Sequence, residues 1–207
     1  MEIPSGHITA IIGTNGAGKS TFVSCLCGLI RKVKGNIFFS GKPFRTKDRL
    51  RQSYLVMQEV NHQLFSDSVR EEIILGLKEP SDSRLKTITD DLDITALYDR
   101  HPMTLSGGQK QRVIIASAFV CGKRILFFDE PTSGLDFTHM MCTCELLKGL
   151  QKKDTFLFII THDFEFIASV CDSVIHIEHG NVIEQYDLDE EGVEQLGRFF
   201  SYSKSSS

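Results

Sequence analysis

A glycine-rich loop between an apolar strand and a helix constrains this chain more than any other feature. Residues 13–21 read GTNGAGKST, with the apolar run ITAII before them and FVSCLCGLI after them. Glycines at 13, 16 and 18 permit tight turns, so successive backbone N–H groups can point at one anion at the start of the helix. The stretch matches G-x-x-x-x-G-K-[ST], flanked by the strand and helix that this motif requires. The loop therefore predicts a polyphosphate site, and a flexible glycine turn with an incidental lysine is the alternative.

Four side chains are suited to a nucleoside triphosphate and its metal ion. The Lys19 ammonium is expected to reach the outer phosphates, and the Ser20 hydroxyl to hold the Mg²⁺ that bridges them. A second metal anchor is expected in RILFFDE, where a buried strand delivers Asp129 at its C-terminal end. Ligands gather at the C-terminal ends of strands in open parallel sheets, so Asp129 and the loop should share one edge. Glu130 follows, and is predicted to orient or deprotonate an attacking water, the alternative being a surface acid.

The order of sequence signals predicts an α/β fold with a mostly parallel sheet and helices on both faces. Short apolar strands alternate with helical patterns, which is typical of parallel pairing. Strand signals are nearly absent from about 60 to 122, so this stretch is predicted to be a helical subdomain, with Ser68 and Glu71 as a capping box. The expected strands are HITAII, NIFFSG, YLVM, RILFFD, TFLFII, SVIHIE and NVIEQ. The last two are expected to form a hairpin at His179 and Gly180.

The chain is predicted to consist of one main domain and a short C-terminal segment. Residues 1–186 form the domain, and the helix after the glycine-rich loop is expected to run through Leu29. Residues 187–207 are expected to form one acidic amphipathic helix, DLDEEGVEQLGRFF, and a disordered tail, SYSKSSS, which has no apolar content with which to order itself.

The composition indicates which kinds of partner the chain can bind and in which cellular compartment it is expected. The net charge of −4 and the pI near 6.0 argue against a nucleic-acid partner, and the basic run at 42–52 is interpreted as solvated surface. No apolar stretch approaches the roughly 18 to 20 residues needed to span a bilayer, and MEIPSGH lacks the features of a signal peptide. The six cysteines show no CxxC pairs, so we expect buried reduced thiols in a soluble intracellular protein.

A second glycine pair at the head of a helix narrows the family. LSGGQKQR, residues 105–112, is another place suited to a phosphate. LSGGQ is the signature sequence of the ATP-binding cassette (ABC) family, and this chain resembles that family from Ile8 to about Gln185. The resemblance implies a P-loop NTPase fold with a helical signature subdomain.

The resemblance also implies a role for each motif residue. Gln58 resembles the glutamine of the Q-loop, which joins the metal ligands Ser20 and Asp129. His162 in IITHD resembles the switch histidine that contacts the γ-phosphate, and Asp136 in SGLD resembles the D-loop aspartate. The implied reaction is ATP hydrolysis with Mg²⁺ as cofactor, and its catalytic residues are Glu130, His162 and Lys19. The implied ATP-binding set is Gly13, Thr14, Asn15, Gly16, Ala17, Gly18, Lys19, Ser20, Thr21 and Gln58.

In this family the signature of one subunit closes over the triphosphate held by another. The resemblance therefore implies a second ABC ATPase subunit, identical or different, as a partner. It also implies membrane-embedded transport subunits, which would hold the chain at the cytoplasmic face of the cell membrane. The signature set that serves the partner's nucleotide is Leu105, Ser106, Gly107, Gly108 and Gln109.

The amino-acid sequences of several loops and of the C-terminal segment suggest which branch of the family this chain resembles. MQEVNHQLFSDSVREEIILG, TSGLDF and EHGNVIEQYDLDEEG are similar to the ATPases of energy-coupling factor importers for vitamins or metal ions, and look most like the second cassette of a tandem form. The alternatives are a soluble ABC ATPase acting on ribosomes or DNA, and a truncated, non-catalytic nucleotide-binding module.

The front of the chain departs from the family pattern. Only twelve residues precede Gly13 and none is aromatic, so the expected adenine-stacking side chain is missing and an N-terminal truncation is expected. Loss of a base–aromatic stack worth roughly 1 to 3 kcal/mol predicts ATP affinity about ten to a hundred times lower. The remaining histidines, 7, 62, 101, 139, 176 and 179, are interpreted as ordinary.

Overall fold

A computed structural model describes residues 1–77, 81–151 and 154–204. Its centre is a six-stranded sheet in the order β4-β5-β6-β1-β7-β8. The first five of these strands pair in parallel, and β8 pairs antiparallel with β7. The strands are β1 Ile8–Ile12, β4 Ser53–Val56, β5 Ile125–Asp129, β6 Phe156–Ile160, β7 Ser173–Glu178 and β8 Asn181–Asp187, with a separate hairpin of β2 Phe38–Phe39 and β3 Lys42–Pro43. The predicted parallel sheet and terminal hairpin are confirmed.

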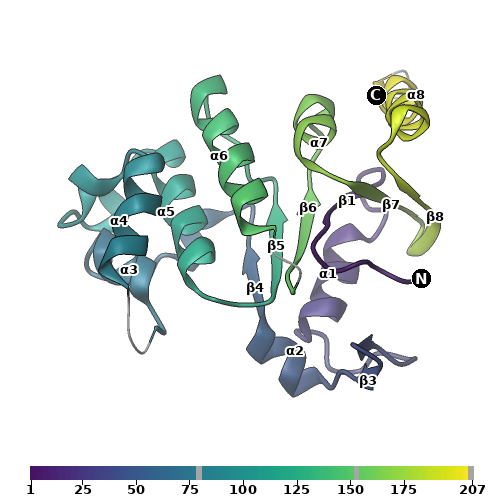
Figure 1. Cartoon of the computed structure of the whole chain (residues 1–207), viewed down its shortest axis with the longest axis horizontal. Helices are drawn as coiled ribbons and strands as arrows, with labels where there is room; N and C mark the ends of the chain where they lie inside the picture. Colours follow the sequence, from purple (N-terminus) through teal and green to yellow (C-terminus); the bar gives the residue numbers. More distant parts are fainter. Residues whose placement is uncertain (78–80, 152–153, 205–207) are drawn as a thin grey trace.

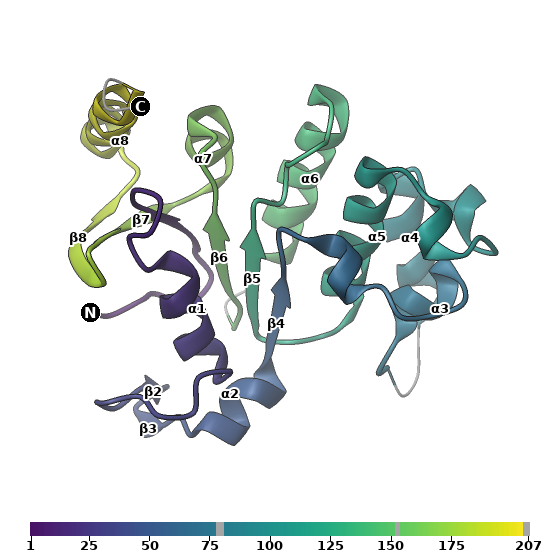
Figure 2. The ribbon, with the colours of Figure 1, turned by 180° about the vertical axis from the view of Figure 1, so that it is seen from behind.

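Helices cover both faces of this sheet (Figures 1 and 2). The α-helices are α1 Lys19–Cys27, α2 Thr46–Gln52, α3 Val69–Ile74, α4 Asp82–Asp91, α5 Gly107–Val120, α6 Phe137–Leu150, α7 Phe164–Val170 and α8 Glu190–Lys204. Short 3-10 helices are η1 Val60–Gln63, η2 Thr95–Leu97 and η3 Pro102–Thr104.

Alternate residues of each buried strand supply two separate cores. Leu126 and Phe128 of β5 belong to the cluster that includes α5, α6, α7 and Leu196 of α8. Ile125 and Phe127, their neighbours, belong to the cluster that includes α1. Successive strand side chains point to opposite faces, so a strand buried on both sides reads as a continuous apolar run. This periodicity explains why the short runs were recognisable in the sequence.

The helical subdomain predicted from about 60 to 122 covers the described residues 60–77 and 81–122, and its bounds stay a prediction. The described part of that stretch contains helices and no strand (Figure 1). Ser68 caps α3 by accepting a hydrogen bond from the N–H of Glu71 at 3.2 Å. Arg84 of α4 donates to the carbonyl of Phe119 at 2.6 Å, which ties α4 to the signature helix α5.

Two local expectations are wrong. The helix α1 ends at Cys27 and not at Leu29, because Gly28 takes the left-handed conformation that closes a helix. The basic run at 42–52 is not all solvated surface, since Arg49 is buried and donates to the carbonyl of Cys25 at 2.7 Å. The short β stretch predicted at NIFFSG is confirmed, and it forms one strand of a two-stranded hairpin that lies apart from the main sheet.

The C-terminal segment forms the predicted helix but reaches further than predicted. The helix α8 continues to Lys204, so the first four residues of SYSKSSS are helical and not disordered, while 205–207 lie outside the described residues. Adding residues to a helix that is already nucleated costs little, which explains the extension. Leu196 is fully buried, so α8 packs on the core. The domain boundary at 186 stays a prediction.

Candidate nucleotide site

The glycine-rich loop leaves the C-terminal end of β1 and turns into α1. Gly18 is the N-cap of α1 with φ of 104°, a left-handed conformation that favours glycine. A Cβ on Gly13 would lie 2.0 Å from the carbonyl oxygen of Ile177, so β7 passes too close for any side chain. The N–H of Gly180 donates to the carbonyl of Ala17 at 2.8 Å. The loop is therefore supported from outside by the β7–β8 hairpin.

Lys19 is folded back onto the loop. Its Nζ donates to the carbonyls of Gly13 at 2.8 Å and Thr14 at 3.0 Å. Burial lowers the pKa of Lys19, while the carboxylates of Glu130 and Asp129 oppose that shift. A buried ammonium facing two carboxylates is suited to exchanging its carbonyl partners for phosphate oxygens.

Asp129 and Glu130 lie at the same sheet edge as the loop. Strand β6 separates β5 from β1, so the ends of three neighbouring strands carry Asp129, His162 and the glycine-rich loop. Burial raises the pKa of Asp129, and the neighbouring carboxylate of Glu130 adds to that shift. The prediction that these side chains share one edge is confirmed.

Glu130 is held in a fixed position by the end of β6. Its Oε2 accepts from the hydroxyl of Thr161 at 2.9 Å, and its Oε1 lies 3.8 Å from Nε2 of His162. Its backbone has φ of 49°, a sparsely populated conformation for a residue other than glycine. The turn therefore directs the carboxylate towards His162, which was predicted to contact the γ-phosphate. Thr161 was not predicted, because a threonine at a strand end has no distinctive sequence signal.

The oxygen donors at this edge fit Mg²⁺. The described residues hold no group of three or more His, Cys, Asp or Glu that could enclose a metal ion. Mg²⁺ in phosphate-transferring sites is bound by one or two carboxylates together with the phosphates of its substrate, and the rest of its shell is water. The Ser20 hydroxyl and the Asp129 carboxylate are donors of this kind. Their roles as ligands remain predictions.

Gln58 lies beyond the end of β4, the strand that pairs with β5. Strand β4 is separated from β1 by two strands, and the side chain of Gln58 is exposed. The backbone just before it is held by Gln63, whose Oε1 accepts from the N–H of Met57 at 2.7 Å and whose Nε2 donates to the carbonyl of Leu55 at 2.6 Å. Gln63 was missed by the sequence analysis. The predicted metal contact of Gln58 stays a prediction.

The signature forms the start of α5. Ser106 and Gln109 make a reciprocal capping box, with bonds of 3.4 Å and 3.1 Å. A Cβ on Gly108 would lie 2.9 Å from the carbonyl of Gly134, so the signature packs against the D-loop of its own chain. Leu105 is buried and Gly107 is exposed. In Figures 1 and 2, β4 and β5 lie between α5 and α1. The chain therefore does not bring its signature to its own glycine-rich loop.

The D-loop aspartate has a structural role here. Asp136 is the N-cap of α6, and its Oδ1 accepts from the N–H of His139 at 3.0 Å and lies 2.8 Å from the ring Nδ1 of that residue. These hydrogen bonds lower the pKa of the exposed Asp136 carboxyl. The assignment of Asp136 to the D-loop is separate from this cap and stays a prediction.

The chain is similar in sequence to one large family. The family profile described as ABC transporter matches residues 1–133, well over half of the 207 residues. The chain belongs to the ABC transporter ATP-binding family. The resemblance inferred from its motifs is confirmed at this level, and members of the family are ATPases.

Individual relatives of this ABC chain differ in length. A Treponema denticola protein described as an ABC transporter ATP-binding protein is 45% identical over 180 residues, which is 87% of this chain and 37% of that protein. The energy-coupling factor transporter ATP-binding protein EcfA3 of Clostridium perfringens is 37% identical over 197 residues, covering 89% of this chain and 69% of that protein. The chain thus spans well under half of the Treponema relative and two thirds of EcfA3.

A solved structure agrees with the fold of this ABC chain. CbiO1 from Clostridium perfringens, described as part of the ABC transporter complex cbiONQ, superposes with a TM-score of 0.75 and 32% identity over 99% of this chain and 90% of that chain. Within the described residues, no helix has both the length and the apolar character needed to cross a membrane.

Proposed function

We propose that this chain binds and hydrolyses ATP as the motor subunit of an ABC importer of the energy-coupling factor type, which takes up vitamins or metal ions. The observation that carries the proposal is the meeting of the glycine-rich loop, Asp129, Glu130 and His162 at one sheet edge. Similarity to EcfA3 and to CbiO1 supports the importer type.

Each group at this edge has a chemical task in hydrolysis. Glu130 accepts the proton of the attacking water or orients it, and Thr161 and His162 hold Glu130 in place. Lys19 leaves the carbonyls of Gly13 and Thr14 for the outer phosphates. Mg²⁺ held by Ser20 and Asp129 neutralises charge on the phosphates when it is bound.

A second cassette completes the site. The signature lies on the far side of β4 and β5 from α1, and its Ser106 and Gly107 are exposed. Backbone N–H groups at an exposed helix start are suited to an anion supplied from outside the chain. A head-to-tail pair would bring the signature of each subunit to the nucleotide of the other.

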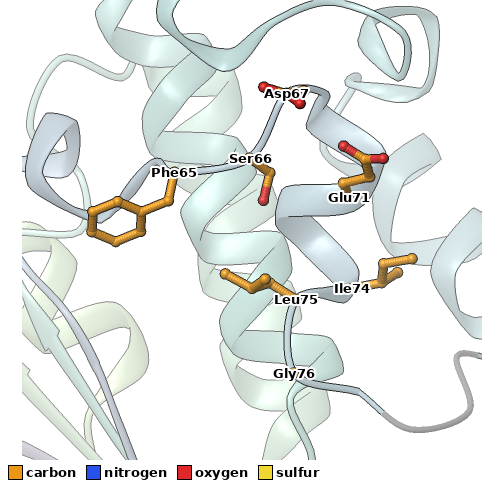
Figure 3. Close-up of a pocket in the computed structure, with 7 residues that line it drawn as sticks. All are labelled: Phe65, Ser66, Asp67, Glu71, Ile74, Leu75 and Gly76. Atoms are coloured by element: carbon orange, nitrogen blue, oxygen red, sulfur yellow. The ribbon is translucent and has the colours of Figure 1, made fainter.

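The membrane subunit is proposed to dock on the helical subdomain. A pocket of about 450 Å³ opens between the segment 65–67 and the end of α3 (Figure 3). Phe65 and Leu75 line it with side chains that are 77% and 61% exposed. Asp67 and Glu71 add negative charge at its rim. A short helix with an apolar face and a basic residue fits this surface.

The pocket is mechanically connected to the rest of the subdomain. Oε2 of the buried Glu72 accepts from the N–H groups of Phe65 at 2.7 Å and Ser66 at 2.8 Å. Ser117 of α5 donates to the carbonyl of Glu72 at 3.4 Å. A helix pressed into the pocket would therefore act on α3 and on the signature helix together.

Substitution of Glu130 by Gln tests the proposal. The variant should bind Mg-ATP as the wild type does, release phosphate at least about a hundredfold more slowly, and accumulate as an ATP-bound pair. Phosphate release and light scattering measure the two effects. Unchanged phosphate release would remove Glu130 from its role, and the absence of Mg-ATP binding by the wild-type chain at millimolar concentration would overturn the proposed function.

A further inference from the structure

One peptide group of the glycine-rich loop lies between two opposite charges. The carbonyl of Gly13 accepts from the Lys19 ammonium at 2.8 Å, and the N–H of Thr14, on the same peptide, donates to Oε1 of Glu178 at 2.9 Å. The Thr14 hydroxyl donates to Oε2 of Glu178 at 2.8 Å. A peptide dipole gripped at both ends by full charges resists rotation, because rotation would break charge-assisted hydrogen bonds. Glu178 thus fixes the entry to the loop from outside it.

Glu178 is connected to the C-terminal helix through side chains. Its Oε1 lies 3.4 Å from Nε2 of His176, and Nδ1 of His176 lies 3.1 Å from Oε1 of Glu184. Gln195 of α8 donates to Oε2 of Glu184 at 2.7 Å. Thr14, Glu178, His176, Glu184 and Gln195 therefore form one chain of contacts, which we call the hairpin relay.

The middle of the hairpin relay is sheltered, with α8 packed on His176, whereas Thr14 is exposed and the side chain of Glu184 is 40% exposed. The side chains of His176 and Glu178 are 15% and 19% exposed. The ring of Phe199 meets the His176 ring edge-on, with centroids 4.9 Å apart. The ring of Phe200, on the same helix, packs against the ring of Phe164 of α7, with ring centroids 6.0 Å apart. Hydrogen bonds shielded from water are stronger, so the position of α8 affects the strength of the relay.

The electrostatics agree with a carboxylate that stays charged. Partial burial alone would raise the pKa of Glu178, but the two hydrogen bonds from Thr14 and the contact with His176 outweigh it and lower that pKa. Glu178 also belongs to the carboxylates that oppose the lowering of the Lys19 pKa by burial. The Glu178 end of the gripped peptide therefore carries its charge at neutral pH.

We propose that Glu178 is a positioning residue for nucleotide binding, and that α8, through Gln195, Glu184 and His176, sets how firmly Glu178 holds the Gly13–Thr14 peptide. This inference rests on the proposed nucleotide-binding role of the loop. Anything that displaces α8, such as a bound partner, would then loosen the loop and weaken nucleotide binding without touching the nucleotide.

Equilibrium binding of Mg-ATP to the full 207-residue chain tests the relay. A fluorescent ATP analogue without turnover reports the dissociation constant. Glu178→Ala should weaken binding about tenfold, and Gln195→Ala about threefold. Because both act through one contact chain, the double variant should bind no more weakly than Glu178→Ala alone. Glu178→Gln keeps the size of the side chain and removes its charge, so it should also weaken binding, and it replaces the alanine variant if that variant does not fold.

The matched control lies one residue away on the same helix. Glu194 is exposed and pairs with Arg198, so Glu194→Gln should leave the dissociation constant unchanged. If the losses of affinity caused by Glu178→Ala and Gln195→Ala multiply in the double variant, the two residues act independently. That result would overturn the relay. Tighter binding by Glu178→Gln would show that its charge repels the triphosphate, and would overturn the positioning role. Failure of the wild type to bind Mg-ATP would instead defeat the proposed function.

Discussion

At the scale of single residues, the glycine-rich loop is held by side chains that lie far from it in the sequence. Lys19, Asp129 and Glu130 belong to short patterns whose chemistry requires those residue types at those spacings. Glu178 was overlooked, because its contact with Thr14 joins residues 164 positions apart. His176, interpreted as ordinary, lies between two carboxylates for the same reason. A pattern of neighbours in sequence cannot contain partners that only folding brings together.

The thiols give a residue-scale prediction. All six cysteines are free, and burial raises the pKa of Cys27 to about 12 and that of Cys171 well above its ordinary value. The thiolate is the reactive form, so these two should resist alkylation in the folded chain. Cys25 and Cys142 are half-buried and should react first. Mass spectrometry after brief iodoacetamide treatment identifies the labelled sites, and equal labelling of Cys171 in the native chain would contradict the prediction. In urea all six should react.

At the scale of elements, two glycines of α8 offer a matched pair. A Cβ on Gly192 would lie 2.0 Å from the carbonyl of Asp187, whereas a Cβ on Gly197 would meet only a Phe164 ring carbon at 3.9 Å. Gly192→Ala should therefore destabilise the chain by about 1 to 3 kcal/mol, as overpacking does. Gly197→Ala should stabilise it by about 0.5 to 1 kcal/mol, because alanine loses less backbone entropy in a helix.

Thermal unfolding followed by circular dichroism measures both glycine variants. For a chain of this length, about 1 kcal/mol corresponds to a shift of roughly 2 to 4 °C in Tm. We expect Gly192→Ala to unfold at a lower temperature than the wild type and Gly197→Ala at a higher one. Equal shifts of the two variants would show that α8 is not packed against the end of β8 as described.

At the scale of the whole molecule, the separation of signature and loop makes a prediction about assembly. Ser106→Arg places a bulky side chain at the exposed start of α5, on the other side of β4 and β5 from α1. The single chain should bind Mg-ATP with an unchanged dissociation constant. Phosphate release should fall about a hundredfold or more, because the paired site loses donors that act on the neighbouring nucleotide.

The prediction is checked by measuring the dissociation constant for Mg-ATP and the rate of phosphate release of Ser106→Arg at several chain concentrations. Loss of a cap at Ser106 costs about 1 kcal/mol, so a melting curve must first show that the variant is folded. Weaker nucleotide binding by dilute, unpaired Ser106→Arg chain would mean that the signature serves its own loop, contrary to the proposed head-to-tail pair.

The sequence by itself determined the class of fold and the family, and it predicted the residues of the nucleotide site. Strand and helix periodicity depends on local geometry, and the phosphate loop and signature use chemistry carried by contiguous residues. Only the tertiary structure decided how far α8 extends, which charged residues are buried, and how Glu178, Gln63 and Glu72 hold the loops. Their roles arise from side-chain contacts between distant segments, and such contacts exist only once the two cores on either side of the sheet have packed.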